Sequence, residues 1–220
     1  MSLWLLFKDE MKGFYKSKVM LVLWFGMPII SFLFHYFQPD TEGIPVSSLV
    51  ALLISSLGGI LASVVLSTAI VNEKNRHVYE LFLIRPVKRR NLLLAKFLAV
   101  YFCLFIATLI SIITGLLIDW FTIGIPAETF LRETFESVSI SLAAMAISSS
   151  IGILIGTLAS SVALAAILSI YIGNQLSLIL MLPTIFIEKL EPLIYAPPLG
   201  ITITVGVLLA TIMIFNRKQF

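Results

Sequence analysis

The sequence has little charge and almost no cysteine. Asp, Glu, Lys and Arg make up 12% of its 220 residues, whereas 59% of the residues are hydrophobic. Because a soluble domain carries about 25% charged residues, this composition excludes an ordinary soluble protein and is typical of a membrane protein. The single cysteine, Cys103, excludes an intramolecular disulfide and any metal site built from several cysteines.

Sequence motifs of enzymes are missing as well. The chain has no GxxxxGK[ST] phosphate-binding loop, no HExxH and no GxSxG. Its two histidines, His35 and His77, are predicted below to lie on opposite sides of a membrane, so they cannot share a metal ion. We therefore expect no catalytic residue, no metal site and no bound cofactor in this chain.

Long apolar runs dominate what is present. A membrane-spanning helix takes about 20 mostly apolar residues. Six segments have this length, and they cover residues 19–37, 46–71, 93–118, 137–159, 162–187 and 193–215. The sequence thus predicts an all-α membrane protein with six transmembrane helices and one transmembrane domain over residues 1–220. A tight turn is expected near Ser160 and Ser161, and Pro197-Pro198 favour a break near the start of the sixth span.

Residues 1–17 precede the first span and carry charged residues among apolar ones. The charges interrupt the apolar run, so the segment does not read as a cleavable signal. The apolar side chains recur at helical spacing, which predicts an amphipathic helix lying in the membrane interface. These side chains belong to Leu3, Trp4, Phe7, Met11 and Phe14.

The basic residues lie almost entirely on one side of the predicted spans. An even number of spans puts both termini on the same side, and positive residues favour the cytoplasm, so we expect both termini and residues 72–96 to be cytoplasmic. The other side holds Arg132, Lys189 and 8 of the 12 acidic residues. This asymmetry explains the net charge of +3 without a nucleic-acid partner. The predicted cytoplasmic side holds 13 of the 15 Lys and Arg residues: Lys8, Lys12, Lys16, Lys18, Lys74, Arg76, Arg85, Lys88, Arg89, Arg90, Lys96, Arg217 and Lys218.

The interiors of the predicted spans contain no Asp, Glu, Lys or Arg. Ion-driven transporters usually place such groups there, so the sequence provides little for ion-driven transport. Asn174 and Gln175 lie near the middle of the fifth span, where they either hydrogen-bond between helices or line a path for a polar substrate. Small residues recur at every fourth position in two spans, which allows helices to pack closely or to slide. They include Ser55, Gly59 and Ser63 in the second span and Ser148, Gly152 and Gly156 in the fourth.

Residues 73–85 combine charge with helical apolar spacing between the second and third spans. In the predicted helix, an acidic residue suits the start, a basic residue suits the end, and Pro86 stops the helix. The segment is either a basic loop that fixes topology or a docking element for a cytoplasmic partner. The candidate docking residues are Glu73, Arg76, His77, Val78, Glu80, Leu81, Phe82, Arg85 and Pro86.

This stretch resembles the signature of the ABC-2 type ABC transporter permeases. Glu73 resembles the acidic residue that ends the family's second span, and Glu80 resembles the glutamate within its coupling helix. The resemblance continues over Pro86-Val87, Arg89 and the Leu-Leu-Leu-Ala-Lys run of residues 92–96, and more loosely over Glu10 and Ser17-Lys18. His77 and Lys88 depart from it, because a glycine and a serine are common at these positions.

The resemblance implies a transmembrane subunit of an ATP-driven exporter in the cytoplasmic membrane of a prokaryote. ATP and magnesium would be bound by a separate ATP-binding subunit, present in two copies, and a second permease subunit would complete a homodimer or heterodimer. Residues 73–85 would be a coupling helix that drives alternating access. Two alternatives remain open: a non-transporting anchor or sensor that recruits a soluble partner through residues 73–85, and an ion-driven carrier.

Overall fold

Helices make up nearly all of the structure, a computed structural model that describes residues 3–15, 18–37, 46–76, 89–122, 128–186 and 192–217. Within these ranges only Arg76 and residues 159–161 are not helical, and no strand is present. The predicted all-α class is confirmed. The helices are α1 (Leu3–Tyr15), α2 (Lys18–Phe37), α3 (Val46–Asn75), α5 (Arg89–Thr122), α6 (Glu128–Leu158), α7 (Val162–Phe186) and α8 (Pro192–Arg217).

Several of these helices are long and apolar enough to cross a membrane. Within the described residues, four qualify by length and composition: 57–75 in α3, 90–121 in α5, 134–158 in α6 and 192–217 in α8. A shorter apolar helical stretch covers 162–173 in α7. The chain is therefore a multi-pass membrane protein. The predicted count of six spans also needs α2 and α7, which are 20 and 25 residues long, and stays a prediction.

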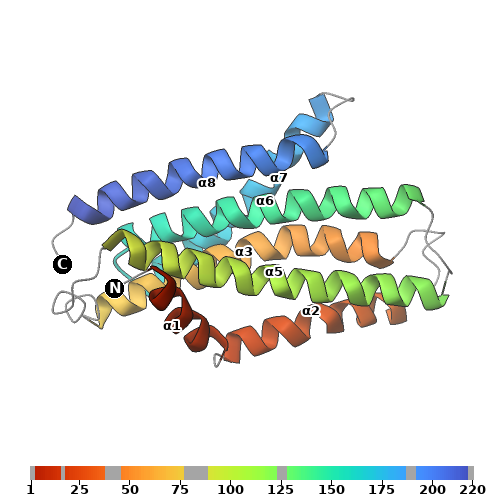
Figure 1. The fold of residues 1–220 in the computed structure, drawn as a ribbon, viewed down its shortest axis with the longest axis horizontal. Coiled ribbons are helices and arrows are strands. Elements are labelled where there is room, and N and C mark those ends of the chain that lie inside the picture. The colour runs from red at the N-terminus through yellow and green to blue at the C-terminus, as the bar shows by residue number, and fades with distance from the viewer. Residues whose placement is uncertain are drawn as a thin grey trace.

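The long helices lie side by side as a bundle, with α3 near its centre (Figure 1). α3 packs against α2, α5, α6 and α7, while α8 packs mainly on α6 and α1 mainly on α5. Both ends of the chain, the end of α3 and the start of α5 lie at the left end of the bundle in Figure 1. We call this end the terminal end. The arrangement follows from short connections between helices that run back and forth.

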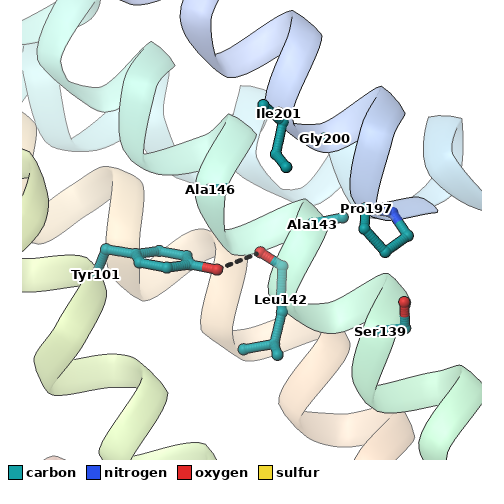
Figure 2. A pocket seen from close by; sticks show the side chains of 8 residues that line it. All are labelled: Tyr101, Ser139, Leu142, Ala143, Ala146, Pro197, Gly200 and Ile201. Atoms are coloured by element: carbon teal, nitrogen blue, oxygen red, sulfur yellow. Dashed lines mark hydrogen bonds between the residues drawn. The ribbon is translucent and has the colours of Figure 1, made fainter. Parts of the chain in front are cut away.

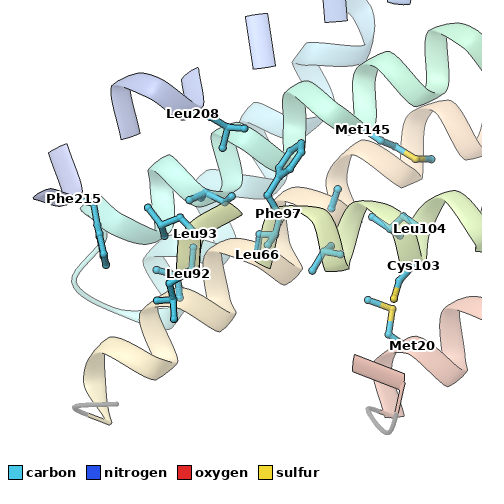
Figure 3. Packing of buried hydrophobic residues seen from close by; sticks show 14 of the residues in the cluster. Met20, Leu66, Leu92, Leu93, Phe97, Cys103, Leu104, Met145, Leu208 and Phe215 are labelled. Atoms are coloured by element: carbon cyan, nitrogen blue, oxygen red, sulfur yellow. The ribbon is translucent and has the colours of Figure 1, made fainter. Parts of the chain in front are cut away.

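Apolar side chains fill the interior and also cover much of the outside. Figure 3 shows Leu66 of α3, Phe97 of α5 and Met145 of α6 in the main cluster, with Leu208 of α8 beside them. Exposed apolar residues run along the outer helices, as for Ile201 of α8 at 62% exposure. Apolar exposure on this scale suits a surface that contacts lipid rather than water.

Close approach of α3 and α6 depends on glycine. A Cβ atom added at Gly152 would lie 2.6 Å from the carbonyl oxygen of Ser63, and one at Gly156 would lie 2.9 Å from that of Ser67. The two small-residue faces of the sequence therefore face each other here. Gly59 contacts another helix as well, because its carbonyl oxygen lies next to Gly173 of α7.

The other small residues predicted for packing are placed less fully. Ser148 is buried on α6, and its hydroxyl has no hydrogen-bond partner among the described residues. Ser55 belongs to α3, but its side chain lies outside the described residues.

Helix bounds differ from the expected spans in two informative places. α6 begins at Glu128 rather than near 137, so residues 128–136 are continuous with the predicted fourth span. α8 runs unbroken through Pro197 and Pro198. Both prolines lie within its first two turns, so only two backbone hydrogen bonds near the helix start are lost.

Candidate functional site

A buried lysine joins three helices at the terminal end. Lys96 lies two turns into α5, and only 2% of it is exposed. Its Nζ atom is 2.6 Å from Oε1 of Glu10 in α1 and 2.5 Å from Oε1 of Glu73 in α3. We call Glu10, Lys96 and Glu73 the ion triad. It fastens the first helix and the end of α3 to the same point on α5.

The charges of the ion triad do not cancel. Two carboxylates share one ammonium group, so the triad carries a net charge of −1 when all three groups are ionised. Burial raises the pKa of Glu10, and the attraction of Lys96 opposes this effect without cancelling it. The second oxygen of Glu73, Oε2, is buried and has no hydrogen-bond partner among the described residues. The lysine therefore offsets the repulsion between two carboxylates that are only partly exposed to water.

Lys74, the residue after Glu73, connects α3 to a different part of the bundle. Lys74 donates from Nζ to the carbonyl oxygen of Ala159 at 3.2 Å. Ala159 follows the end of α6, where carbonyl groups lack helical partners and a cation is favoured. In the same turn the Ser161 hydroxyl accepts the backbone N–H of Leu164 at 3.2 Å and so caps α7. The end of α3 is thus tied both to α5 and to the turn between α6 and α7.

Only part of the predicted docking segment lies in the described structure. Glu73 belongs to the ion triad. Arg76 is exposed directly after α3, and its backbone N–H donates to the carbonyl of Asn72 at 3.1 Å. The remaining predicted residues lie outside the described residues, so their coupling role stays a prediction; they are His77, Val78, Glu80, Leu81, Phe82, Arg85 and Pro86.

The polar interruption of the fifth predicted span lies within α7. Gly173 packs against α3, because a Cβ atom there would lie 3.2 Å from the Cα atom of Ile60. Gln175 is exposed, and the side chain of Asn174 lies outside the described residues. The proposed roles of the two amides therefore stay predictions.

Two charged residues have roles that the sequence reasoning missed. The sequence reasoning placed Lys96 at the cytoplasmic entry to the third span and Asp119 in the loop just beyond that span, yet both lie inside α5 and are buried. Oδ2 of Asp119 accepts the backbone N–H of Ser47 at 2.9 Å, which caps the start of α3 at the far end of the bundle. The position of Asp119 in the sequence did indicate a partner. An acidic residue near the C-terminal end of a helix is unfavourable with the helix dipole, so its carboxylate needs a hydrogen-bond donor elsewhere.

Comparison with protein families accounts for almost the whole chain. A model of the ABC-2 family transporter proteins matches residues 4–216. This range includes all three residues of the ion triad and every helix except the extreme ends of α1 and α8. Comparison with curated proteins gave no match.

Proposed function

We propose that this chain, which belongs to the ABC-2 family of transporter proteins, is the transmembrane subunit of an ATP-driven exporter. As a permease of an ABC transporter, it is a membrane transport component without an ATPase site of its own. ATP and magnesium are then bound by two copies of a separate subunit. A second permease subunit, identical or related, completes the complex in the cytoplasmic membrane of a prokaryote.

The terminal end is the proposed cytoplasmic face. Both chain ends, the end of α3 and the start of α5 lie there, and 13 of the 15 basic residues lie on that side if the six predicted spans are all crossed. Basic residues near span ends favour the cytoplasm. The ATP-binding subunits then approach this end and bind residues 73–85.

The ion triad is the observation that carries the proposed mechanism. Glu73 lies near the end of α3 and is the first residue of the predicted docking segment 73–85, so a push on that segment acts on Glu73 directly. The short contacts from Lys96 to Glu73 and to Glu10 carry the displacement to α5 and α1. The bond from Lys74 to Ala159 carries it to the turn between α6 and α7. A buried, bonded joint transmits force better than a solvated loop, because it has few alternative arrangements.

α3 and α5 move together in this mechanism. They are fastened at the terminal end by Glu73 and Lys96, and at the far end by Ser47 and Asp119. Because the two helices are bonded at both ends, the pair moves as one rigid unit. Around Gly152 and Gly156 the backbones of α3 and α6 approach closely with small residues between them, whereas Met145 of α6 lies against Gly58 of α3. The small-residue part of this contact suits a small shear between the helix pair and α6. Such a shear opens the path to alternate sides of the membrane.

Co-purification and ATP hydrolysis test this function directly. We expect the chain to purify with an ATP-binding subunit when the two are expressed together. We also expect the chain to change the rate of ATP hydrolysis by that subunit. Neutralising the phosphate-loop lysine of that subunit is the control, and it removes hydrolysis without removing association. Association without any ATP-dependent effect on the membrane helices indicates an anchor. Absence of association refutes the proposal, as does flux that follows an ion gradient and ignores ATP.

A further inference from the structure

A pocket lies between α5, α6 and α8, and none of its lining residues belongs to the ion triad. Its volume is about 210 Å³. Figure 2 shows Tyr101 reaching from α5 toward α6, with Pro197 and Ile201 of α8 on the opposite side. At the seam between α6 and α8, the lining includes Ala143 and Gly200, which are both buried. The proposed coupling route does not use this pocket.

The position of the pocket makes it accessible from lipid. Tyr101 lies about 18 Å along α5 from Arg89 at about 1.5 Å per residue, which is near the middle of a hydrocarbon layer of about 30 Å. Pro197 and Ile201 form part of the lining and are exposed on the surface of the bundle. A ligand that dissolves in the bilayer can therefore reach the pocket sideways, without passing through water.

The lining is apolar apart from two hydroxyl groups. The Tyr101 hydroxyl donates to the carbonyl of Leu142 at 3.4 Å, which is long for such a bond, so a better acceptor can replace that carbonyl. The Ser139 hydroxyl is buried and has no hydrogen-bond partner among the described residues. A buried hydroxyl without a partner is unfavourable, so a ligand oxygen here would satisfy it. Among the described residues no charged side chain lines the pocket, so the charge of an ionic ligand would find no partner there.

We propose that this pocket binds a small uncharged amphiphile from the membrane, about one substituted ring in size, with one hydrogen-bonding oxygen. The size follows from the volume, because an apolar cavity of about 150 Å³ accommodates benzene. The ring contacts the apolar walls beside Ala146 and Ile201. The ligand oxygen hydrogen-bonds to the hydroxyl of Tyr101 or, after the Ser139 side chain rotates, to the hydroxyl of Ser139.

Binding of para-fluorophenol to the full chain in lipid nanodiscs tests the proposal. Fluorine NMR, with empty nanodiscs subtracted, is expected to show a saturable component. Ala146→Phe fills the pocket and is expected to weaken binding at least tenfold. The double variant Tyr101→Phe, Ser139→Ala keeps the shape, and its loss of hydrogen bonds is expected to weaken binding about 3–10-fold. Fluorobenzene, which lacks the oxygen, should bind the wild type more weakly by a similar factor.

The control is Thr202→Val, which removes an exposed α8 hydroxyl that does not line the pocket and instead donates to the carbonyl of Leu199 at 3.0 Å. Its binding should equal that of the wild type. If Ala146→Phe does not fold, the double variant and the fluorobenzene comparison still decide the question. Absence of saturable binding, equal binding by Ala146→Phe, equal binding of fluorobenzene, or a tightly held lipid chain that the phenol does not displace would each overturn the proposal.

Discussion

Replacing Lys96 by methionine is the sharpest test of the ion triad. Methionine is close to lysine in length and helix propensity, so the change removes the charge and little else. It leaves Glu10 and Glu73 facing each other across a site that held one ammonium group between them. Replacing either carboxylate is milder, because Glu10→Gln or Glu73→Gln leaves one neutral ion pair.

The expected loss of stability in Lys96→Met follows from the burial of the three side chains. Removing one partner of a buried ion pair costs about 3–5 kcal/mol. The lysine side chain is 3% exposed, but those of Glu10 and Glu73 are 22% and 27% exposed, so water relieves part of the repulsion. We therefore expect the low end, about 3 kcal/mol, which corresponds to a fall in Tm of about 6–12 °C for a chain of this length.

Cys103 provides the assay. It is the only cysteine of the chain, it is buried, and its sulfur lies 3.7 Å from that of Met11 in α1. A thiol-reactive dye that fluoresces on reaction therefore reports the release of α1 and the unfolding of the bundle. Temperature scans of the wild type and of Lys96→Met in the same detergent give the shift in Tm.

A matched control and a rescue make the result interpretable. Arg132 pairs with Glu136 at 3.2 Å one turn along α6 and is 63% exposed, so Arg132→Met should cost at most about 0.5 kcal/mol. The triple variant Lys96→Met, Glu10→Gln, Glu73→Gln removes the repulsion and should regain most of the lost stability. It should still fail to couple ATP hydrolysis to helix motion. A Lys96→Met protein no less stable than Arg132→Met would refute the reasoning.

Two further predictions rest on contacts in the structure, and a third on the predicted docking segment. Gly152→Ala should push α3 and α6 apart and cost about 1–3 kcal/mol in thermal unfolding, whereas Gly206→Ala, with nothing within 4 Å of the added Cβ, should cost nothing; equal effects would contradict the close packing. Burial raises the pKa of Glu10 in the folded protein, so ionisation of this carboxyl opposes folding. As the pH falls from above that raised pKa to below 4.5, the Tm of the wild type should therefore rise relative to the Tm of Glu10→Gln. A relative fall in Tm would contradict this prediction. Glu80→Arg should abolish most of the ATPase stimulation, since it reverses charge on the predicted docking helix, and normal stimulation would exclude that role.

Helix positions were predictable from the sequence because membrane helices need long apolar runs. The predicted span 19–37 lies within α2 at Lys18–Phe37, and 162–187 differs from α7 by one residue at its end. Helix ends were less predictable. α5 extends to Arg89 and Thr122, beyond the predicted 93–118, and its residues Lys96 and Asp119 have partners on other helices.

The sequence by itself determined the class of the protein and its family resemblance. The apolar runs required helices, the basic residues predicted a cytoplasmic side, and residues 73–96 carried the resemblance that the family match over residues 4–216 bears out. Each of these properties depends on residues close together in the chain, or on their sum.

Only the tertiary structure decided which charges meet. Glu10, Glu73 and Lys96 are separated by tens of residues, and the sequence placed them in three different segments: the N-terminal interfacial helix, the predicted docking segment and the entry to the third span. Packing of α1 and α3 on α5 brings them within hydrogen-bond distance and removes most of the water around the lysine. Long-range contacts of this kind follow from how helix faces fit together, which spacing along one helix does not encode. The same fit forms the pocket between α5, α6 and α8.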